Sequence, residues 1–418
     1  MTNVRTIKEV EFILKNINWS FYPKPITTSD KIHPFNCRKY HWYPATFIPE
    51  IPFTLIEILS LPGAKIYDPF VGIGTTFIQA LLLNRIPFGT DISSVSIEFI
   101  KSLLILFNPK TNLDLVNETI LKDLGKFKSD INYFKILENS NENLQFENLK
   151  VWYTEEIFNA LCFLVHTESK HQDIPTKAVY RITISSLLSM LSRQDRGWGC
   201  IADNVKPKVY QINKIDAINK FNQTALRLIK DIANIKNICN GDILETYQFF
   251  ENNETIFRSD VMDSENIKSI IPSETIDLVI TSPPYPNMAD YTTSQRLSHY
   301  YFDNDINLEK GMEIGARHRR ASSNSLMQYK SDMLKANESI SNVLKKNALA
   351  CFIMPSFNSD NEKNSLRKIV VQEVMANIET LGLTKELEIE RIIPNVRRAH
   401  NLKWATLEKE LIHIYKKI

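Results

Sequence analysis

Residues 66–76 read Ile-Tyr-Asp-Pro-Phe-Val-Gly-Ile-Gly-Thr-Thr, and this stretch decides the fold of the 418-residue chain. It begins as a short apolar strand, turns at two glycines and leads into a helical pattern at 77–84. A strand, a glycine turn and a helix form the first βα unit of a nucleotide-binding sheet. Gly72 and Gly74 allow positive φ and a close approach of the backbone to a ligand. We therefore predict a ligand site at the carboxyl end of this strand.

The residues around this turn favour a cationic ligand. A second strand at 86–90 ends in Asp91, at about the spacing from Asp68 that is expected of an acid binding a ribose hydroxyl pair. The third glycine of a pyrophosphate site is replaced by Thr75 and Thr76. The carboxylate of Asp68 would repel a pyrophosphate but suits a cation. This pattern favours S-adenosylmethionine, which carries a sulfonium and an ammonium group, over a dinucleotide.

A second informative stretch is Thr281-Ser282-Pro283-Pro284-Tyr285, which follows a buried-strand pattern at 275–280. Ligands of open α/β sheets bind at the carboxyl edge, where such a strand ends. The two prolines stiffen the turn and remove two backbone donors, which leaves carbonyl groups free to accept. Acceptors beside an aromatic ring suit the amino group of a planar base. The alternative is a plain turn that ends a strand.

Both stretches, in this order, resemble motifs of the class I, S-adenosylmethionine-dependent DNA methyltransferases that act on exocyclic amino groups. Residues 68–75 resemble their cofactor motif, and 281–285 resemble their catalytic (T/S)SPPY motif. Residues 41–49 resemble the segment that closes over the methionine end of the cofactor, and 260–261 match the position that holds its adenine. The resemblance implies cofactor contacts from Tyr43, Pro44, Ala45, Asp68, Pro69, Phe70, Gly72, Gly74, Thr75, Asp91, Ile92, Asp260 and Val261. It implies a catalytic set of Ser282, Pro283, Pro284 and Tyr285.

The resemblance also implies how the reaction proceeds. The Ser282 hydroxyl and the Pro283 carbonyl would each accept one N–H of the target amino group, and Tyr285 would stack on a base that has left the DNA duplex. Attack at cytosine C5 is excluded because none of the five cysteines follows a proline. Serine at the first motif position favours cytosine N4. Adenine N6 and, less favoured, an RNA base amine remain as alternatives.

Alternating strand and helix patterns predict a mostly parallel α/β sheet of the class I methyltransferase type, ending in an antiparallel strand. We expect four segments: a polar N-terminal lead at 1–35, the first part of the catalytic core at 36–100, a mainly helical insert at 101–250, and the second part of the core at 251–418. An insert of this length is too long for a loop. It is a candidate target-recognition region.

Several basic residues are candidates for DNA contacts. Arg193 and Arg196 lie in a segment that breaks the helical pattern and also contains Trp198. A second group consists of Arg317, Arg319 and Arg320. A surface turn and a solvated loop are the respective alternatives. A third basic group near the C-terminus contains Arg391, Arg397, Arg398, His400 and Lys403. Asp290 is expected to cap a helix that follows the second motif.

Composition adds few constraints. The net charge of +2 is nearly neutral, so charge alone does not indicate a nucleic-acid-binding protein. The cysteines form no Cys-x-x-Cys pair, so we expect neither a metal site nor a disulfide framework. The chain shows no signal peptide and no long apolar run, which predicts a cytoplasmic protein without membrane contact. The expected partners are double-stranded DNA and, in a restriction–modification pair, a separately encoded endonuclease.

Overall fold

The computed structural model describes residues 7–21, 33–139, 146–193, 216–239, 244–302, 304–358, 362–394 and 407–418. Its seven strands are β1 (Lys65–Asp68), β2 (Ile86–Asp91), β3 (Ile256–Arg258), β4 (Ile276–Thr281), β5 (Leu344–Ser356), β6 (Leu383–Ile392) and β7 (Lys409–Lys417). They form one sheet in the order β3-β2-β1-β4-β5-β7-β6. The first five strands are parallel, and β7 runs antiparallel to β5 and β6. This is the class I methyltransferase sheet, as the sequence predicted.

The helices before β3 are α1 (Ile7–Asn16), η1 (Cys37–Lys39), α2 (Glu50–Leu59), α3 (Thr75–Leu82), α4 (Ser94–Phe107), α5 (Leu113–Leu124), α6 (Tyr133–Asn139), η2 (Phe146–Trp152), α7 (Glu155–Lys170), α8 (Ile174–Leu191), α9 (Ala217–Cys239) and α10 (Leu244–Asn252). Those after β3 are α11 (Ser264–Ile270), α12 (Tyr291–Ser294), α13 (Arg296–Phe302), α14 (Ile306–Met312), η4 (Arg317–Ala321), α15 (Ser325–Val343) and α16 (Glu362–Thr380). No helix among the described residues is long and apolar enough to cross a membrane.

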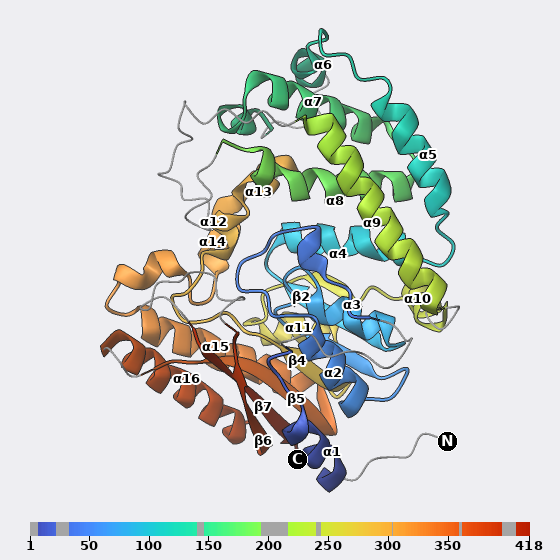
Figure 1. Ribbon diagram of the computed structural model, residues 1–418. Helices are drawn as coiled ribbons and strands as arrows, with labels where there is room; N and C mark the ends of the chain where they lie inside the picture. The colour runs from blue at the N-terminus through green and yellow to red at the C-terminus, as the bar shows by residue number, and fades with distance from the viewer. Residues whose placement is uncertain are drawn as a thin grey trace.

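Helices cover both faces of the sheet (Figure 1). Along β5 the side chains alternate: Cys351 and Ile353 belong to one buried cluster, while Ala350 and Phe352 belong to another. The first cluster packs against α1 and α2, and the second packs against α11, α15 and α16. A strand buried on both faces is expected for a sheet of this type, and it explains the nearly continuous apolar sequence of β4 and β5.

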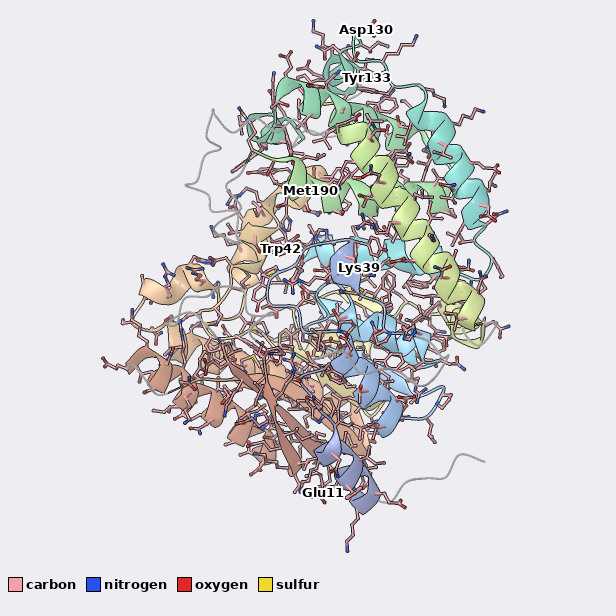
Figure 2. The ribbon with its side chains drawn as sticks, in the orientation of Figure 1. Glu11, Lys39, Trp42, Asp130, Tyr133 and Met190 are labelled. Carbon is pink, nitrogen blue, oxygen red and sulfur yellow. The ribbon has the colours of Figure 1, made fainter. Side chains whose placement is uncertain are left out.

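Helices α5 to α9 form a bundle beyond the sheet, drawn at the top of Figure 1. Their apolar side chains belong to a single buried cluster that continues through α4 into α3. Tyr180 of α8 and Phe221 of α9, for example, have ring centroids 4.9 Å apart. In Figure 2, Asp130 and Tyr133 mark the far end of this bundle, and Trp42 lies between Met190 and the sheet. The bundle is therefore anchored on the helical layer that borders the ligand edge.

Candidate active site

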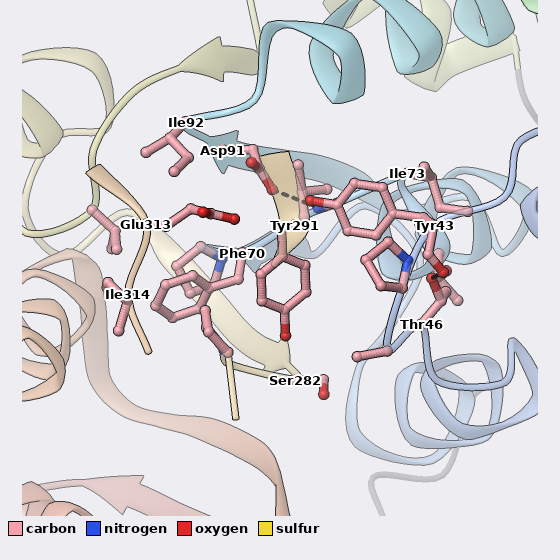
Figure 3. Close-up of a pocket in the computed structure, with 18 of the residues that line it drawn as sticks. Tyr43, Thr46, Phe70, Ile73, Asp91, Ile92, Ser282, Tyr291, Glu313 and Ile314 are labelled. Carbon is pink, nitrogen blue, oxygen red and sulfur yellow. Dashed lines mark hydrogen bonds between the residues drawn. The ribbon is translucent and has the colours of Figure 1, made fainter. Parts of the chain in front are cut away.

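A cavity lies at the carboxyl edge of the sheet, where β1, β2, β3 and β4 end (Figure 3). The empty space there measures about 790 Å³, including space open to solvent. The predicted residues that line it are Tyr43, Pro44, Ala45, Pro69, Phe70, Gly72, Thr75, Asp91, Ile92, Asp260, Val261, Ser282 and Pro284. The cofactor motif and the Ser-Pro-Pro-Tyr motif therefore meet in one cavity.

The glycine turn after β1 has the conformation that its sequence predicts. Gly72 has φ of 49° and Gly74 has φ of 81°, so both lie in the left-handed region. Gly74 precedes α3, and a Cβ atom there would lie 2.8 Å from Ile100 Cγ1. The turn is therefore fixed on one side by packing of Gly74 against Ile100, while Gly72 borders the cavity.

Asp91 closes the end of β2 and holds this turn. Its Oδ2 accepts a hydrogen bond from the Gly72 N–H at 2.8 Å, and its Oδ1 accepts from the Ser93 N–H at 2.9 Å. Burial raises the pKa of Asp91 to about 6, while the N–H groups of Ser93 and Gly72 oppose that rise. The carboxylate is thus preorganised beside the cavity, as expected of a group that binds ribose hydroxyls.

Asp68 lies behind the cavity wall rather than in it. Its side chain is only 1% exposed, and its Oδ1 accepts from the Thr281 hydroxyl at 2.6 Å and from the Phe70 N–H at 3.1 Å. Burial raises the pKa of Asp68 to about 6, and the Thr281 hydroxyl lowers it. Asp68 therefore joins the end of β1 to the end of β4 and so ties the cofactor motif to the catalytic motif.

The segment at 41–47 forms another wall of the cavity. The His41 ring donates through Nε2 to Gln295 Oε1 at 2.6 Å, and Gln295 donates to the Trp42 carbonyl at 2.9 Å. Ala45 has φ of 53°, which is uncommon for a residue with a side chain. Backbone strain of this kind is typical of ligand sites. Gln295, which lies between α12 and α13, thus fixes this wall although it is distant in sequence.

Within the motif at 281–285, alternate residues face different ways. Ser282 and Pro284 line the cavity, whereas Pro283 and Tyr285 do not. The Tyr285 side chain is 6% exposed, and its hydroxyl donates to Glu410 Oε1 of β7 at 2.8 Å. This geometry directs the tyrosine toward the sheet, so a stacking role would require the loop to rearrange when a base enters.

Glu410 also pairs with Arg391 of β6, whose Nε donates to the Trp19 carbonyl at 2.9 Å. Arg391 is 4% exposed, so its assignment to a basic surface group near the C-terminus was wrong. The periodic burial of β6 places it on the inward face of the strand. The other members of that group lie outside the described residues.

The remaining wall of the cavity comes from Tyr291 and from Met312, Glu313 and Ile314 at the end of α14. The residues at 312–314 were not predicted. They reach the site because the Asn287 N–H donates to the Gly315 carbonyl at 2.8 Å, which folds this segment back onto the motif loop. The only local signal is Gly315, which has φ of 63°. A single glycine gives no indication of which distant segment it contacts.

The basic group at 317–320 forms η4 rather than the expected loop, and it lies beside the motif segment. Arg317 donates its N–H to the Ala289 carbonyl at 2.9 Å, and the Arg319 guanidinium donates to the Gly311 carbonyl at 2.8 Å. Arg320 is exposed. Burial lowers the pKa of Arg367 on α16, and the positive charges of Arg320 and Arg317 add to that effect. The cations of two elements therefore face one another near the rim.

Asp290 stands at the N-cap position of α12, as predicted, but its side chain makes no capping hydrogen bond. Its Oδ1 instead accepts from the His318 N–H at 2.7 Å, and it lies 2.9 Å from His318 Nδ1. Asp290 therefore attaches η4 to the motif loop. Arg193 follows α8 and donates to the Val151 carbonyl at 3.0 Å, away from the cavity. Arg196 and Trp198 lie outside the described residues.

Comparisons with known proteins agree with this geometry. Residues 8–102 match a family model described as DNA methylase. Type II methyltransferase M.BsoBI of Geobacillus stearothermophilus is 30% identical over 64% of this chain and 53% of its own length. Type II methyltransferase M.MvaI of Kocuria varians is 23% identical over 65% of this chain and 58% of its own length. The chain thus spans somewhat more than half the length of these relatives.

Among solved structures, an rRNA methyltransferase from Streptomyces viridochromogenes aligns with 93% of this chain and 88% of its own, at 9% identity and a TM-score of 0.30. The fold assignment rests on the strand order and not on this alignment. The chain is therefore similar to DNA methylases in sequence, and its sheet has the class I strand order.

Proposed function

We propose that this protein transfers a methyl group from S-adenosylmethionine to the exocyclic amino group of a base in double-stranded DNA, with cytosine N4 as the favoured target. One observation carries the proposal: Ser282 and Pro284 line the same cavity as Gly72 and Asp91. Acceptors for an amino group therefore stand next to the residues expected to hold the cofactor. The names of both type II relatives support DNA as the substrate.

The residues of the cavity fit the cofactor. Asp91 has a carboxylate fixed beside the glycine turn, and Asp260 and Val261 line the place expected for the adenine. Phe70 and Ile92 add apolar surface for a nucleoside. When bound, S-adenosylmethionine supplies an electrophilic methyl group on a sulfonium. The task left to the protein is to place the amino group in line with that methyl.

The amino group is a poor nucleophile because its lone pair is conjugated into the ring. The Ser282 hydroxyl and the Pro283 carbonyl would each accept one N–H and hold both hydrogens out of the ring plane, which frees the lone pair for attack. Positioning and fixed acceptors supply the rate enhancement. The proton leaves the methylated amino group after transfer, so no strong base is needed. Pro283 must turn its carbonyl toward the base, since only Ser282 and Pro284 border the cavity here.

Access to the amino group requires the target base to leave the duplex. The segment at 101–250 is our candidate for target recognition, and Arg193, Arg196, Arg317, Arg319 and Arg320 are candidate DNA contacts. Host DNA as substrate would place the protein in the cytoplasm. A separately encoded endonuclease is the partner expected if the protein acts in a restriction–modification pair.

Adenine N6 is the main alternative target, since a hydroxyl can accept a hydrogen bond from either base. Base-resolved modification mapping of host DNA, with and without expression of the full chain, separates the two. We expect N4-methylcytosine at one short sequence and its loss in Ser282→Ala. N6-methyladenine would keep the site and change the base. No mark on DNA from a chain that binds S-adenosylmethionine would overturn DNA as the substrate and leave an RNA base amine.

A further inference from the structure

Glu313 is a buried carboxylate that enters the cavity from a segment to which no role has been assigned. It follows α14, and its side chain is 2% exposed. In Figure 3 its carboxylate points from the wall formed with Ile314 toward the middle of the cavity, on the side opposite Thr46. Asp91 and Phe70 border the same space. A charged group in this position needs a structural or a ligand-binding reason.

One oxygen of the Glu313 carboxylate has a hydrogen-bond partner, and the other has none among the described residues. Glu313 Oε1 accepts from the Thr292 N–H at 2.7 Å, which holds the start of α12. Oε2 is buried and has no hydrogen-bond partner among the described residues. Leaving a buried charged acceptor without a partner destabilises the folded protein. The structural role of Oε1 does not explain why the second oxygen faces the cavity, so a donor from a ligand is the natural partner.

The charged group that most affects the pKa of Glu313 is the carboxylate of Asp290. Burial raises the pKa of Glu313 to about 7, and the negative charge of Asp290 adds to the rise. The N–H groups of Thr292 and Tyr291 and the Thr292 side chain oppose it. On the neighbouring elements, the hydroxyls of Tyr43 and Tyr291 lie close enough for the charge of Glu313 to raise their pKa values. Asp91, at the end of β2, acts on both tyrosines in the same direction. Two carboxyl groups, Asp91 and Glu313, therefore border the cavity together.

We propose that Glu313 contacts the bound cofactor, with Oε2 accepting a hydrogen bond from one of its hydroxyl or amino groups. Its charge then favours the sulfonium of S-adenosylmethionine over the uncharged thioether of the product, S-adenosylhomocysteine. The inference rests on the proposed function only for the identity of the cofactor, and it holds for either target base. Glu313 would thus help to bind the donor and to release the product.

The test is a calorimetric titration of the full chain with S-adenosylmethionine and with S-adenosylhomocysteine. Glu313→Gln retains an oxygen acceptor for the Thr292 N–H but loses the charge and replaces Oε2 by a donor. Glu265→Gln is the matched control, because Glu265 is an exposed carboxylate on α11 that pairs with Lys268. Circular dichroism and thermal unfolding of each unliganded variant would show whether the fold is retained.

We expect Glu313→Gln to weaken S-adenosylmethionine binding by roughly 10- to 100-fold, the value of one hydrogen bond to a charged group. Binding of S-adenosylhomocysteine should weaken less, and Glu265→Gln should bind both as the parent does. Unchanged affinity of a folded Glu313→Gln for both ligands would overturn the inference. Equal weakening for both ligands would keep the contact and overturn selection by charge. A parent chain that binds neither ligand would instead contradict the proposed function.

Discussion

Tyr285 shows that a residue of the catalytic motif can also be a fixed part of the sheet. Its hydroxyl donates to Glu410 of β7, which pairs in turn with Arg391 of β6. Through this buried chain the motif loop after β4 is attached to strands that lie beyond β5. The ring is then held in place while the neighbouring Ser282 faces the cavity. We infer that the tyrosine hydroxyl positions the loop, independently of any stacking by the ring.

Tyr285→Phe separates these two roles. It keeps the ring but leaves Glu410 Oε1 without the hydroxyl donor, so the free energy of unfolding should fall by about 1–3 kcal/mol. We expect methylation to be reduced but present in Tyr285→Phe and lost in Tyr285→Ala. Urea unfolding and methyl transfer to DNA measure the two effects. If Tyr285→Phe is as stable as the parent, the hydroxyl does not hold the loop.

At the scale of elements, local signals predicted helices well and their contacts poorly. Helix α4, for example, begins after Ser93, which caps it by accepting from the Ser96 N–H, and an apolar pattern continues to its end. The predicted antiparallel strand at the end of the sheet is confirmed, because β7 runs antiparallel to β5 and β6. Sequence periodicity and capping residues contain this information.

What the sequence did not predict depends on contacts between distant segments. Glu313 lines the cavity because Gly315 bonds to Asn287, and Asp290 binds His318 instead of capping α12. Arg391 is buried and pairs with Glu410, although the sequence places it near several other basic residues. Neither periodicity nor composition records such pairings. They are fixed only when the elements are assembled.

The position of η4 leads to a prediction about DNA. Burial lowers the pKa of Arg367, and the positive charges of Arg320 and Arg317 lower it further. The Arg319 guanidinium, in contrast, donates a hydrogen bond to the Gly311 carbonyl. Arginines that repel one another near the rim of the cavity would be stabilised by the negative phosphates of a DNA backbone. Replacing Arg317 and Arg320 together with alanine should weaken DNA binding and reduce the slope of log affinity against log salt by about 1–2.

The matched control removes two lysines of α1, Lys8 and Lys15, which lies at the other end of the molecule from the helical bundle in Figure 1. Fluorescence anisotropy with a duplex of unrelated sequence at several salt concentrations gives both slopes. We expect the α1 variant to retain the parent slope. A parent-like slope in the arginine variant would show that η4 does not contact phosphates.

At the scale of the whole molecule, the helical bundle and the cavity share one polar network. His41 lies 3.1 Å from the Ser185 hydroxyl of α8, which in turn lies 3.0 Å from the Ser298 hydroxyl of α13. His41 also bonds to Gln295, which holds the cavity wall at Trp42. Burial lowers the pKa of His41 to about 4, so the network is neutral at physiological pH. A bundle that recognises DNA would therefore be in direct contact with the cofactor site.

Buried titratable groups in the molecule fall into two sets with opposite effects on stability. Burial raises the pKa of carboxyl groups at the ligand edge, to about 6 for Asp68 and Asp91 and to about 7 for Glu313. Burial lowers the pKa of histidines, to about 4 for His41 and His413 and to about 3 for His299.

Between about pH 4 and 6 the folded chain holds more protons than the unfolded chain at these carboxyls and fewer at these histidines. The carboxyl contribution to stability therefore falls as pH rises, the histidine contribution rises, and the two largely cancel. An unfolded histidine keeps part of its charge up to about pH 7.5, so the histidine contribution to stability continues to rise to that pH. Glu313 loses its proton over the same range, so the stability of the unliganded protein should change little between about pH 6.5 and 7.5.

A cationic ligand adds a pH dependence of its own, which gives a prediction for the whole molecule. Ionised Asp91 and Glu313 attract S-adenosylmethionine, so the increase in melting temperature that it causes should grow from about pH 5.5 to about pH 7.5. The increase caused by S-adenosylhomocysteine should change much less, because its thioether is uncharged. In Glu313→Gln the part of the rise near pH 7 should disappear, while the part near pH 6 remains with Asp91. Thermal unfolding of the parent and this variant with each ligand measures all of these shifts. Equal pH dependence for both ligands would mean that the charge of the ligand does not interact with the buried carboxyls.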